Sequence, residues 1–154
     1  MEKRKVPTVE CQMMIRKPVS EVFQAFIDPT ITTKFWFTKS NGKLEVGKTV
    51  TWDWEMYNVS GDVKVNEIVP NEKISIEWDE PATTVDFEFA ALTDGTTYVV
   101  IKNYGFSQTG DDLIAAIKDN TGGFTTVLDG LKAYLEYGIE LNLVKDKFPH
   151  IKQK

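Results

Sequence analysis

The sequence predicts an α+β fold in which a curved, seven-stranded antiparallel sheet holds one long C-terminal helix. Between residues 41 and 104, short runs alternate apolar and polar side chains and are separated by turn signals, as in strands with one buried face. From about Asp111 to Val144, apolar residues recur with the period of an α-helix. An apolar sheet face must be covered, and this helix is the only predicted element long enough to cover it. The arrangement is a helix-grip fold.

The chain is predicted to begin with a strand and two short helices. The strand covers residues 6–15, and Pro18 follows it at a position that favours the start of a helix. Asp28 and Pro29 end this first helix, and they supply the N-cap and first-turn proline of a second helix that reaches to about Phe35. Two consecutive short helices after one strand are an unusual opening for a domain of this kind.

Six further strands are predicted before the long helix. In the run after Gly47, Trp52 and Trp54 share one face, whereas Asp53 and Glu55 share the other. We therefore expect the tryptophans to face the interior and the two acids to face solvent. Later runs repeat this rhythm, and their expected inward residues are Val63, Val65, Ile74, Ile76, Trp78, Val85, Phe87, Phe89, Val99, Ile101 and Asn103.

The long helix carries glycines on its apolar side. Gly123, Gly130 and Gly138 fall inside or at the edge of the apolar arc. The arc consists of Phe124, Val127, Leu128, Leu131, Leu135 and Ile139. A glycine within a helix costs about 1 kcal/mol relative to alanine, so three of them indicate either a close approach to the helix or a need for open space. The pair at 122–123 is also a candidate hinge or kink.

Length and charge indicate one acidic domain spanning residues 1–154. A chain of 154 residues with 42% hydrophobic content can bury a substantial core. The formal net charge of −5 argues against a nucleic-acid surface, which needs a concentrated basic face. No apolar run approaches the roughly 18 residues of a membrane-spanning helix, and no signal-peptide core follows Met1. We expect a cytoplasmic protein with no nucleic-acid partner and no membrane span.

The chain offers little material for metal or nucleophilic chemistry. Cys11 is the only cysteine and His150 is the only histidine, so neither a thiolate zinc site nor a Cys/His catalytic pair is expected. Cys11 has apolar neighbours in the first strand, and His150 lies in the C-terminal tail. No glycine motif for binding phosphate or a dinucleotide is present. We predict no metal, no cofactor and no catalytic role for either residue.

Short motifs follow one another in a recognisable order along nearly the whole chain. They are Pro18-Val19-Ser20-Glu21-Val22-Phe23, Phe35-Trp36, Leu44-Glu45-Val46-Gly47, Gly61-Asp62-Val63, Glu67-Ile68-Val69-Pro70, Glu77-Trp78, Asp94-Gly95-Thr96-Thr97 and Gly122-Gly123-Phe124. This order resembles the START-like or Bet v 1-like superfamily, and more closely its branch named after the activator of Hsp90 ATPase. The resemblance implies an internal cavity between sheet and helix, used across the superfamily for lipids, sterols, polyketides and other apolar molecules. It implies no catalytic residue.

The expected ligand is therefore a small apolar or amphipathic molecule. Aromatic walls with a few polar anchors are the usual form of a small-molecule site, although each aromatic residue taken singly could simply pack in a core. Phe124 stands where many relatives have tryptophan and keeps an aromatic wall. The candidate ligand-binding residues are Trp36, Trp52, Trp54, Trp78, Phe87, Asn103, Phe124, Val127, Leu131 and Tyr134.

Two other functions stay open at this point. An enzyme of the cyclase or dehydratase kind would use Asn103 or Tyr134 to orient or polarise a bound carbonyl group. A protein-interaction role like that of a chaperone activator is suggested by the name of the branch alone.

Overall fold

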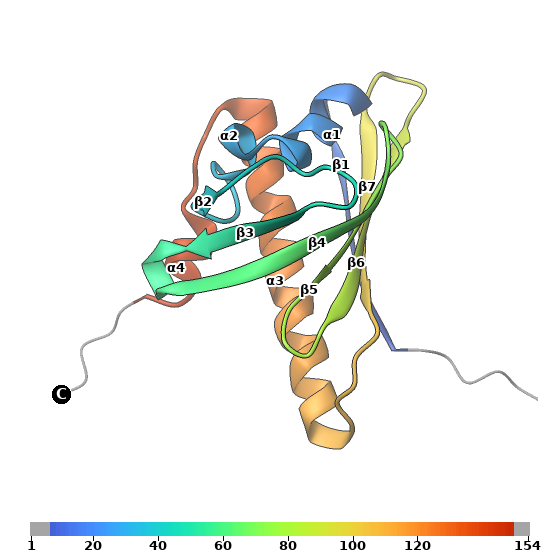
Figure 1. Cartoon of the computed structure of the whole chain (residues 1–154). Helices are drawn as coiled ribbons and strands as arrows, with labels where there is room; N and C mark the ends of the chain where they lie inside the picture. Colours follow the sequence, from blue (N-terminus) through green and yellow to red (C-terminus); the bar gives the residue numbers. More distant parts are fainter. Residues whose placement is uncertain (1–6, 150–154) are drawn as a thin grey trace, which may run out of the picture.

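The computed structural model describes residues 7–149 (Figure 1). A strand, two short helices, six further strands and a long helix follow one another as predicted. The elements are β1 (Thr8–Ile15), α1 (Val19–Ile27), α2 (Pro29–Thr32), β2 (Lys39–Ser40), β3 (Thr49–Trp54), the 3-10 helix η1 (Glu55–Tyr57), β4 (Val59–Val69), β5 (Lys73–Trp78), β6 (Thr83–Ala91), β7 (Thr97–Tyr104), α3 (Gly110–Tyr137) and α4 (Leu143–Lys147).

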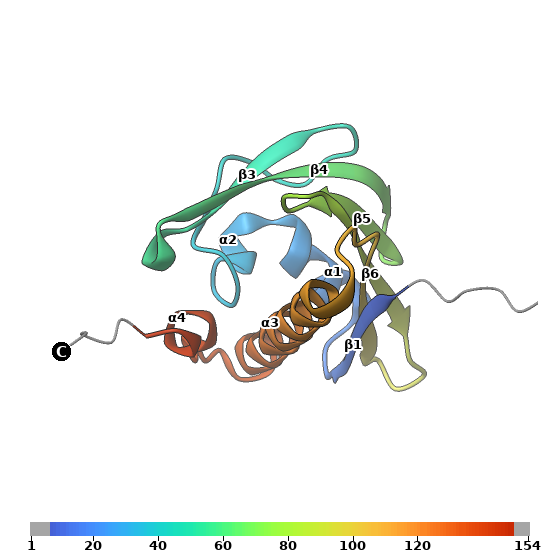
Figure 2. The ribbon, with the colours of Figure 1, turned by 90° about the horizontal axis from the view of Figure 1, so that it is seen from below.

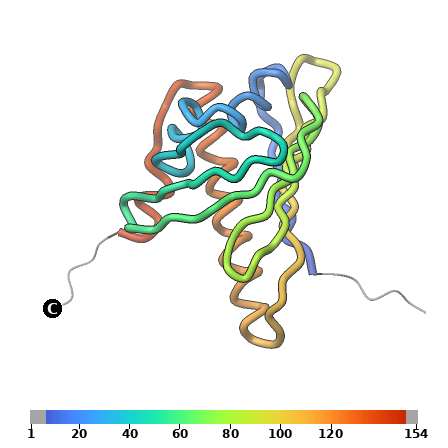
Figure 3. The backbone as a smooth tube through the Cα atoms, in the orientation of Figure 1, coloured from blue at the N-terminus to red at the C-terminus, as the bar shows by residue number. Residues whose placement is uncertain are grey.

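The strands form one antiparallel, seven-stranded sheet in the order β1-β7-β6-β5-β4-β3-β2. β1 pairs with β7 over its whole length, and the two strands lie side by side in the backbone trace of Figure 3. The register of β4 shifts between Val65 and Glu67, and such a bulge bends a strand. Figure 2 shows the sheet curving around α1 and α3. The predicted α+β helix-grip fold is confirmed.

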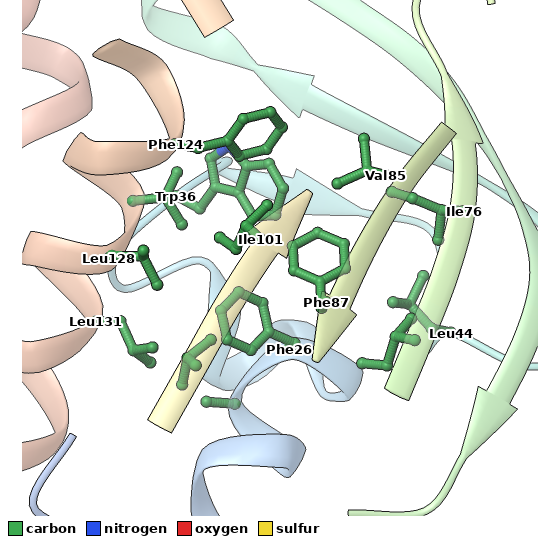
Figure 4. Close-up of a cluster of buried hydrophobic side chains, with 14 of the residues drawn as sticks. Phe26, Trp36, Leu44, Ile76, Val85, Phe87, Ile101, Phe124, Leu128 and Leu131 are labelled. Carbon is green, nitrogen blue, oxygen red and sulfur yellow. The ribbon is translucent and has the colours of Figure 1, made fainter. Parts of the chain in front are cut away.

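The concave face of the sheet carries the alternating apolar residues. Val99, Ile101 and Asn103 are fully buried, as predicted, whereas Val100 and Lys102 between them are half-buried. Burial of this face against the helices is the main stabilising contribution. Figure 4 shows where side chains of the sheet meet those of the helices and of the segment after α2: Phe26, Trp36, Leu44, Ile76, Val85, Phe87, Ile101, Phe124, Leu128 and Leu131.

The second helix is shorter than predicted. Asp28 caps it, because its Oδ1 accepts hydrogen bonds from the backbone N and the hydroxyl of Thr30 at 3.0 and 2.8 Å. The helix ends at Thr32 and not near Phe35. The next amides, those of Lys34 and Phe35, donate to carbonyls only three residues back, which tightens the chain into turns. The aromatic residues that follow are thereby directed into the core.

The long helix also ends earlier than predicted, at Tyr137 instead of Val144. Gly138 follows with a φ of +66°, a left-handed conformation that glycine adopts most readily. Its N–H donates to Tyr134 O at 2.8 Å and closes the helix. Ile139, which was expected in the apolar arc, is 50% exposed. The chain then turns back, and α4 forms a separate short helix that contacts α3.

The glycines of α3 have different roles, and the helix is continuous through the pair at 122–123. A Cβ built at Gly130 would lie 3.2 Å from both Cβ and the carbonyl oxygen of Phe35, so this glycine permits a close approach. A Cβ built at Gly123 would meet no atom within 4 Å, so the helix borders open space there. Gly138 caps the helix and does not lie on its buried side.

Alanine at these two glycines is expected to have opposite effects on stability. Gly123→Ala should raise the free energy of unfolding by up to about 1 kcal/mol, because alanine is the better helix former and its methyl group meets no neighbour. Gly130→Ala should lower the free energy of unfolding by about 1 kcal/mol, because crowding of the new methyl group against Phe35 outweighs the gain in helix propensity. Urea unfolding of both variants beside the parent measures the difference. Equal effects at the two positions would show that the spacing described for α3 is wrong.

An ion pair near the end of α3 is hydrogen-bonded to the backbone at the end of β1. Lys132 Nζ lies 2.6 Å from Glu136 Oε2 and 3.0 Å from Met14 O. Glu136 Oε2 also accepts the backbone N–H of Arg16 at 2.9 Å, and the Glu136 side chain is 5% exposed. Burial alone would raise the pKa of Glu136, but the hydrogen bonds from Lys132 and Arg16, with the charge of Lys132, hold that pKa below its ordinary value.

This pKa predicts an acid-sensitive contribution to stability. Because the pKa of Glu136 is lower in the folded chain than in the unfolded one, the carboxylate stabilises the fold above the unfolded value of about 4.3. The contribution is lost as the pH falls through the lowered folded value. Glu136→Gln should therefore cost about 1–3 kcal/mol at pH 7 and less at pH 3. Urea unfolding at both pH values, with the exposed Glu140→Gln as control, tests this, and an equal cost at both would refute it.

Candidate ligand-binding groove

A groove of about 1300 Å³ opens between the far end of the sheet and the helical layer. One wall is formed by β3, η1 and β4, and the other by α3 and α4; these elements face each other in Figure 2. Trp36 from the segment after α2 and Trp78 from the end of β5 complete the lining. β1, at one edge of the sheet, packs against α3, whereas β3 and β4 near the other edge stand across the groove from it.

Aromatic rings form a connected apolar lining. The ring of Phe124 lies 5.5 Å from that of Trp78 and 6.0 Å from that of Trp36, measured between centroids. Trp54 continues the series at 6.3 Å from Trp78. Such edge-to-face and tilted contacts fix the rings relative to one another, so the apolar surface is already arranged before any ligand arrives.

Half of the predicted contact residues line this groove. They come from the segment after α2, the ends of β3 and β5, and the middle of α3: Trp36, Trp54, Trp78, Phe124 and Val127.

The other predicted residues lie outside the lining. Trp52, Phe87, Leu131 and Asn103 are buried in the core and are not among the lining residues, and Tyr134 is half-buried farther along α3. The alternation of side chains identifies which face of a strand is buried. It does not say how far along the strand the core is filled.

The amide of Asn103 is oriented by its neighbours. Nδ2 donates to Thr83 Oγ1 at 3.0 Å and to Thr84 O at 2.9 Å, while Oδ1 has no partner among the described residues. Both amide hydrogens are therefore used, and the free atom is an acceptor. Asn103 in this arrangement cannot donate a hydrogen bond to a bound carbonyl group, which is the role that the cyclase or dehydratase alternative requires.

The sequence interpretation missed lining residues on both walls of the groove. Tyr57 and Val59 contribute from η1 and β4, and Val144 and Phe148 contribute from α4 and the residue after it. A continuous helix to Val144 would have placed these last residues beyond the sheet. The signal that could have found them is Gly138, since a glycine after a helical period is a common helix stop.

The rim of the groove carries charges of both signs. Lys118 and Lys147 provide two cations from the helical side. The acidic residues of the lining are Asp62, Asp79, Glu80 and Asp119. Acids outnumber bases, so the rim favours an uncharged or cationic polar group over a carboxylate.

Cys11, Asp53 and Glu55 are not among the residues that line the groove. Cys11 is buried, with Sγ 3.5 Å from Thr121 O, and Asp53 is half-buried and Glu55 exposed. His150 lies outside the described residues. Within residues 7–149, no three acidic, histidine or cysteine side chains are grouped to hold a metal ion. In the same part of the chain, no helix combines the length and apolar character needed to cross a membrane.

The family model described as "Activator of Hsp90 ATPase homolog 1-like protein" matches residues 16–136. The chain belongs to this family. The match begins just after β1 and covers the other six strands, both short helices and nearly all of α3, so the groove walls formed by β3, β4 and α3 lie within the family region. α4 lies beyond it. No curated protein matches the chain.

Solved structures similar to this family member share its fold. A Staphylococcus saprophyticus protein is 26% identical, with a TM-score of 0.78 over 88% of this chain and 96% of its own. DynU16, a protein in the dynemicin biosynthetic locus, is 18% identical with a TM-score of 0.77; the match covers 86% of this chain and only 48% of DynU16. The Aha1 dimer from Colwellia psychrerythraea is 20% identical, with a TM-score of 0.73 over 86% of this chain and 98% of its own.

Proposed function

We propose that this protein binds one small apolar or amphipathic molecule in the groove between β3–β4 and α3. The observation that carries the proposal is the set of contacting rings of Trp36, Trp78 and Phe124 along a groove of about 1300 Å³. Small-molecule sites are typically concave and mostly apolar, with pocket volumes of about 300–1,000 Å³, and this groove is larger than that range. A groove of this size accommodates a ligand of several fused rings or a long alkyl chain.

The polar groups around the groove support binding more than catalysis. Asn103 has no free N–H group to polarise a carbonyl, and Tyr134 lies outside the lining. The charged residues of the lining stand at its rim. A ligand held by the aromatic rings would place its apolar body among them and its polar end near the rim.

Titration with the neutral apolar dye Nile red tests this proposal. We expect saturable binding with one dye per chain and a blue shift of its emission, because the aromatic lining excludes water. The same titration of urea-unfolded protein is the control for nonspecific uptake. Emission that rises linearly without saturation in the folded protein would reject a defined site.

A further inference from the structure

α4 and the residue after it close one side of the groove. Val144, Lys147 and Phe148 line the groove from the helical side, and Tyr57 lines it from η1, at the tip of the β3–β4 wall. In Figure 1, α4 lies at this tip of the sheet, and Figure 2 shows it displaced from the axis of α3 toward the open side. The segment therefore spans the distance between the two walls.

This segment is held weakly by the rest of the fold. No residue of α4 is fully buried, although Leu143 and Val144 are half-buried and Val144 packs against the core, and residues 138–141 before it are all exposed. Gly138 and Asn142, which bracket the exposed stretch, both have left-handed backbone angles, with φ of +66° and +57°. From α4 to the middle of α3, one side-chain contact reaches hydrogen-bond range: Lys147 Nζ lies 3.5 Å from Thr126 Oγ1. Few buried contacts and exposed flanks are the properties of a segment that opens locally.

One side chain fastens the segment to the opposite wall. The hydroxyl of Tyr57 directs its single hydrogen toward the carbonyl oxygens of Val144 and Lys145, the latter at 3.1 Å, and accepts the N–H of Phe148 at 3.2 Å. The rings of Tyr57 and Phe148 lie 6.2 Å apart at 69°. Tyr57 thus contacts three residues of the C-terminal segment, although they are more than 80 residues away in sequence.

We propose that residues 143–148 form a strap across the mouth of the groove, and that Tyr57 is the latch that holds the strap closed. This inference rests on the proposed function, because a strap controls entry only where a ligand is bound. The exposed stretch 138–142 serves as the hinge. Ligand enters and leaves when the hydrogen bonds of the Tyr57 hydroxyl break and the strap swings away from η1.

Stopped-flow kinetics of Nile red with Tyr57→Phe test the strap, since this substitution removes the hydroxyl and keeps the ring against Phe148. A latch slows entry and exit alike. We therefore expect both the association and the dissociation rate constants to rise about tenfold, as for the loss of one to two hydrogen bonds. The dissociation constant should change by less than about threefold, because binding affinity follows the ratio of the two rates. Tyr137→Phe, an exposed tyrosine at the end of α3, is the matched control and should change neither rate.

Amide hydrogen exchange in the absence of dye gives a second, independent readout. Amides of residues 143–148 should exchange about tenfold faster in Tyr57→Phe than in the parent, while those of β6 and β7 should not change. Unchanged exchange in this segment, or weaker dye binding caused by faster dissociation alone, would overturn the strap and make Tyr57 an ordinary wall residue. Failure of the parent to bind Nile red saturably would instead overturn the proposed function, and the strap with it.

Discussion

Gly123→Trp is expected to weaken Nile red binding more than tenfold while leaving the fold intact. Gly123 lines the groove, and a Cβ built there meets no atom within 4 Å, so an indole ring at this position can occupy the space that the dye needs. The substitution also removes a glycine from the middle of a helix, which offsets part of any cost of the larger side chain. Dye titration together with thermal unfolding measures both effects.

The control for this variant is Ala115→Trp. Ala115 is exposed on α3 and lies outside the groove lining, so a tryptophan there should leave the affinity for Nile red unchanged. Unchanged binding by Gly123→Trp would show that the dye binds elsewhere. A large loss of stability in the same variant would mean that the space beside Gly123 is filled.

Leu131→Trp is expected to lower the free energy of unfolding by about 1–3 kcal/mol, the range typical of overpacked cores. Leu131 lies eight residues along α3 from Gly123, but it is fully buried and belongs to the packed layer. A tryptophan there must displace neighbours that already fill the available volume.

The measurement for this variant is urea unfolding beside Gly123→Trp, since both place the same side chain on the same helix. We expect a marked loss of stability at position 131 and little at position 123. If Leu131→Trp were as stable as the parent and lost dye binding, the groove would extend deeper along α3 than the structure indicates.

The sheet could be predicted because alternation is a local signal. Trp52 in β3, Phe87 in β6 and Ile101 in β7 are inward-facing in the sequence pattern and buried in the structure. The antiparallel topology follows from short turns between successive strands. The pairing of β1 with β7 joins the first and last strands of the chain at one edge of the sheet, and no periodicity in the sequence indicates such a distant contact.

The end of α3 was predicted wrongly, because the apolar spacing continues past the residue at which the backbone leaves the helical conformation. Ile139 fits the helical arc by its spacing, yet Gly138 adopts a left-handed conformation and ends the helix. The sequence pattern placed Gly138 among three glycines on the apolar side of the helix. Its backbone angles instead make it the residue that caps the helix. The position of α4 depends on this turn, so the strap could not be foreseen.

The candidate site could be predicted only in part for a related reason. Trp36, Trp78 and Phe124 were named as aromatic ligand-binding candidates, and they line the groove. Leu131 and Asn103 were also expected to face inward, but they are buried and lie outside the lining. Whether an inward residue meets packing or open space depends on how far the sheet curves away from α3, which is a property of the assembled structure.

Native mass spectrometry tests the central claim most directly. The folded protein would be incubated with a total lipid extract and a mixture of uncharged polycyclic aromatic compounds, exchanged into volatile buffer, and compared with Gly123→Trp treated in the same way. The groove predicts a parent ion carrying one added small molecule per chain, with the same compound absent from the variant. A parent that retains no compound under conditions that preserve the fold, or a variant that retains it equally well, would contradict the assignment of this groove as a ligand-binding site.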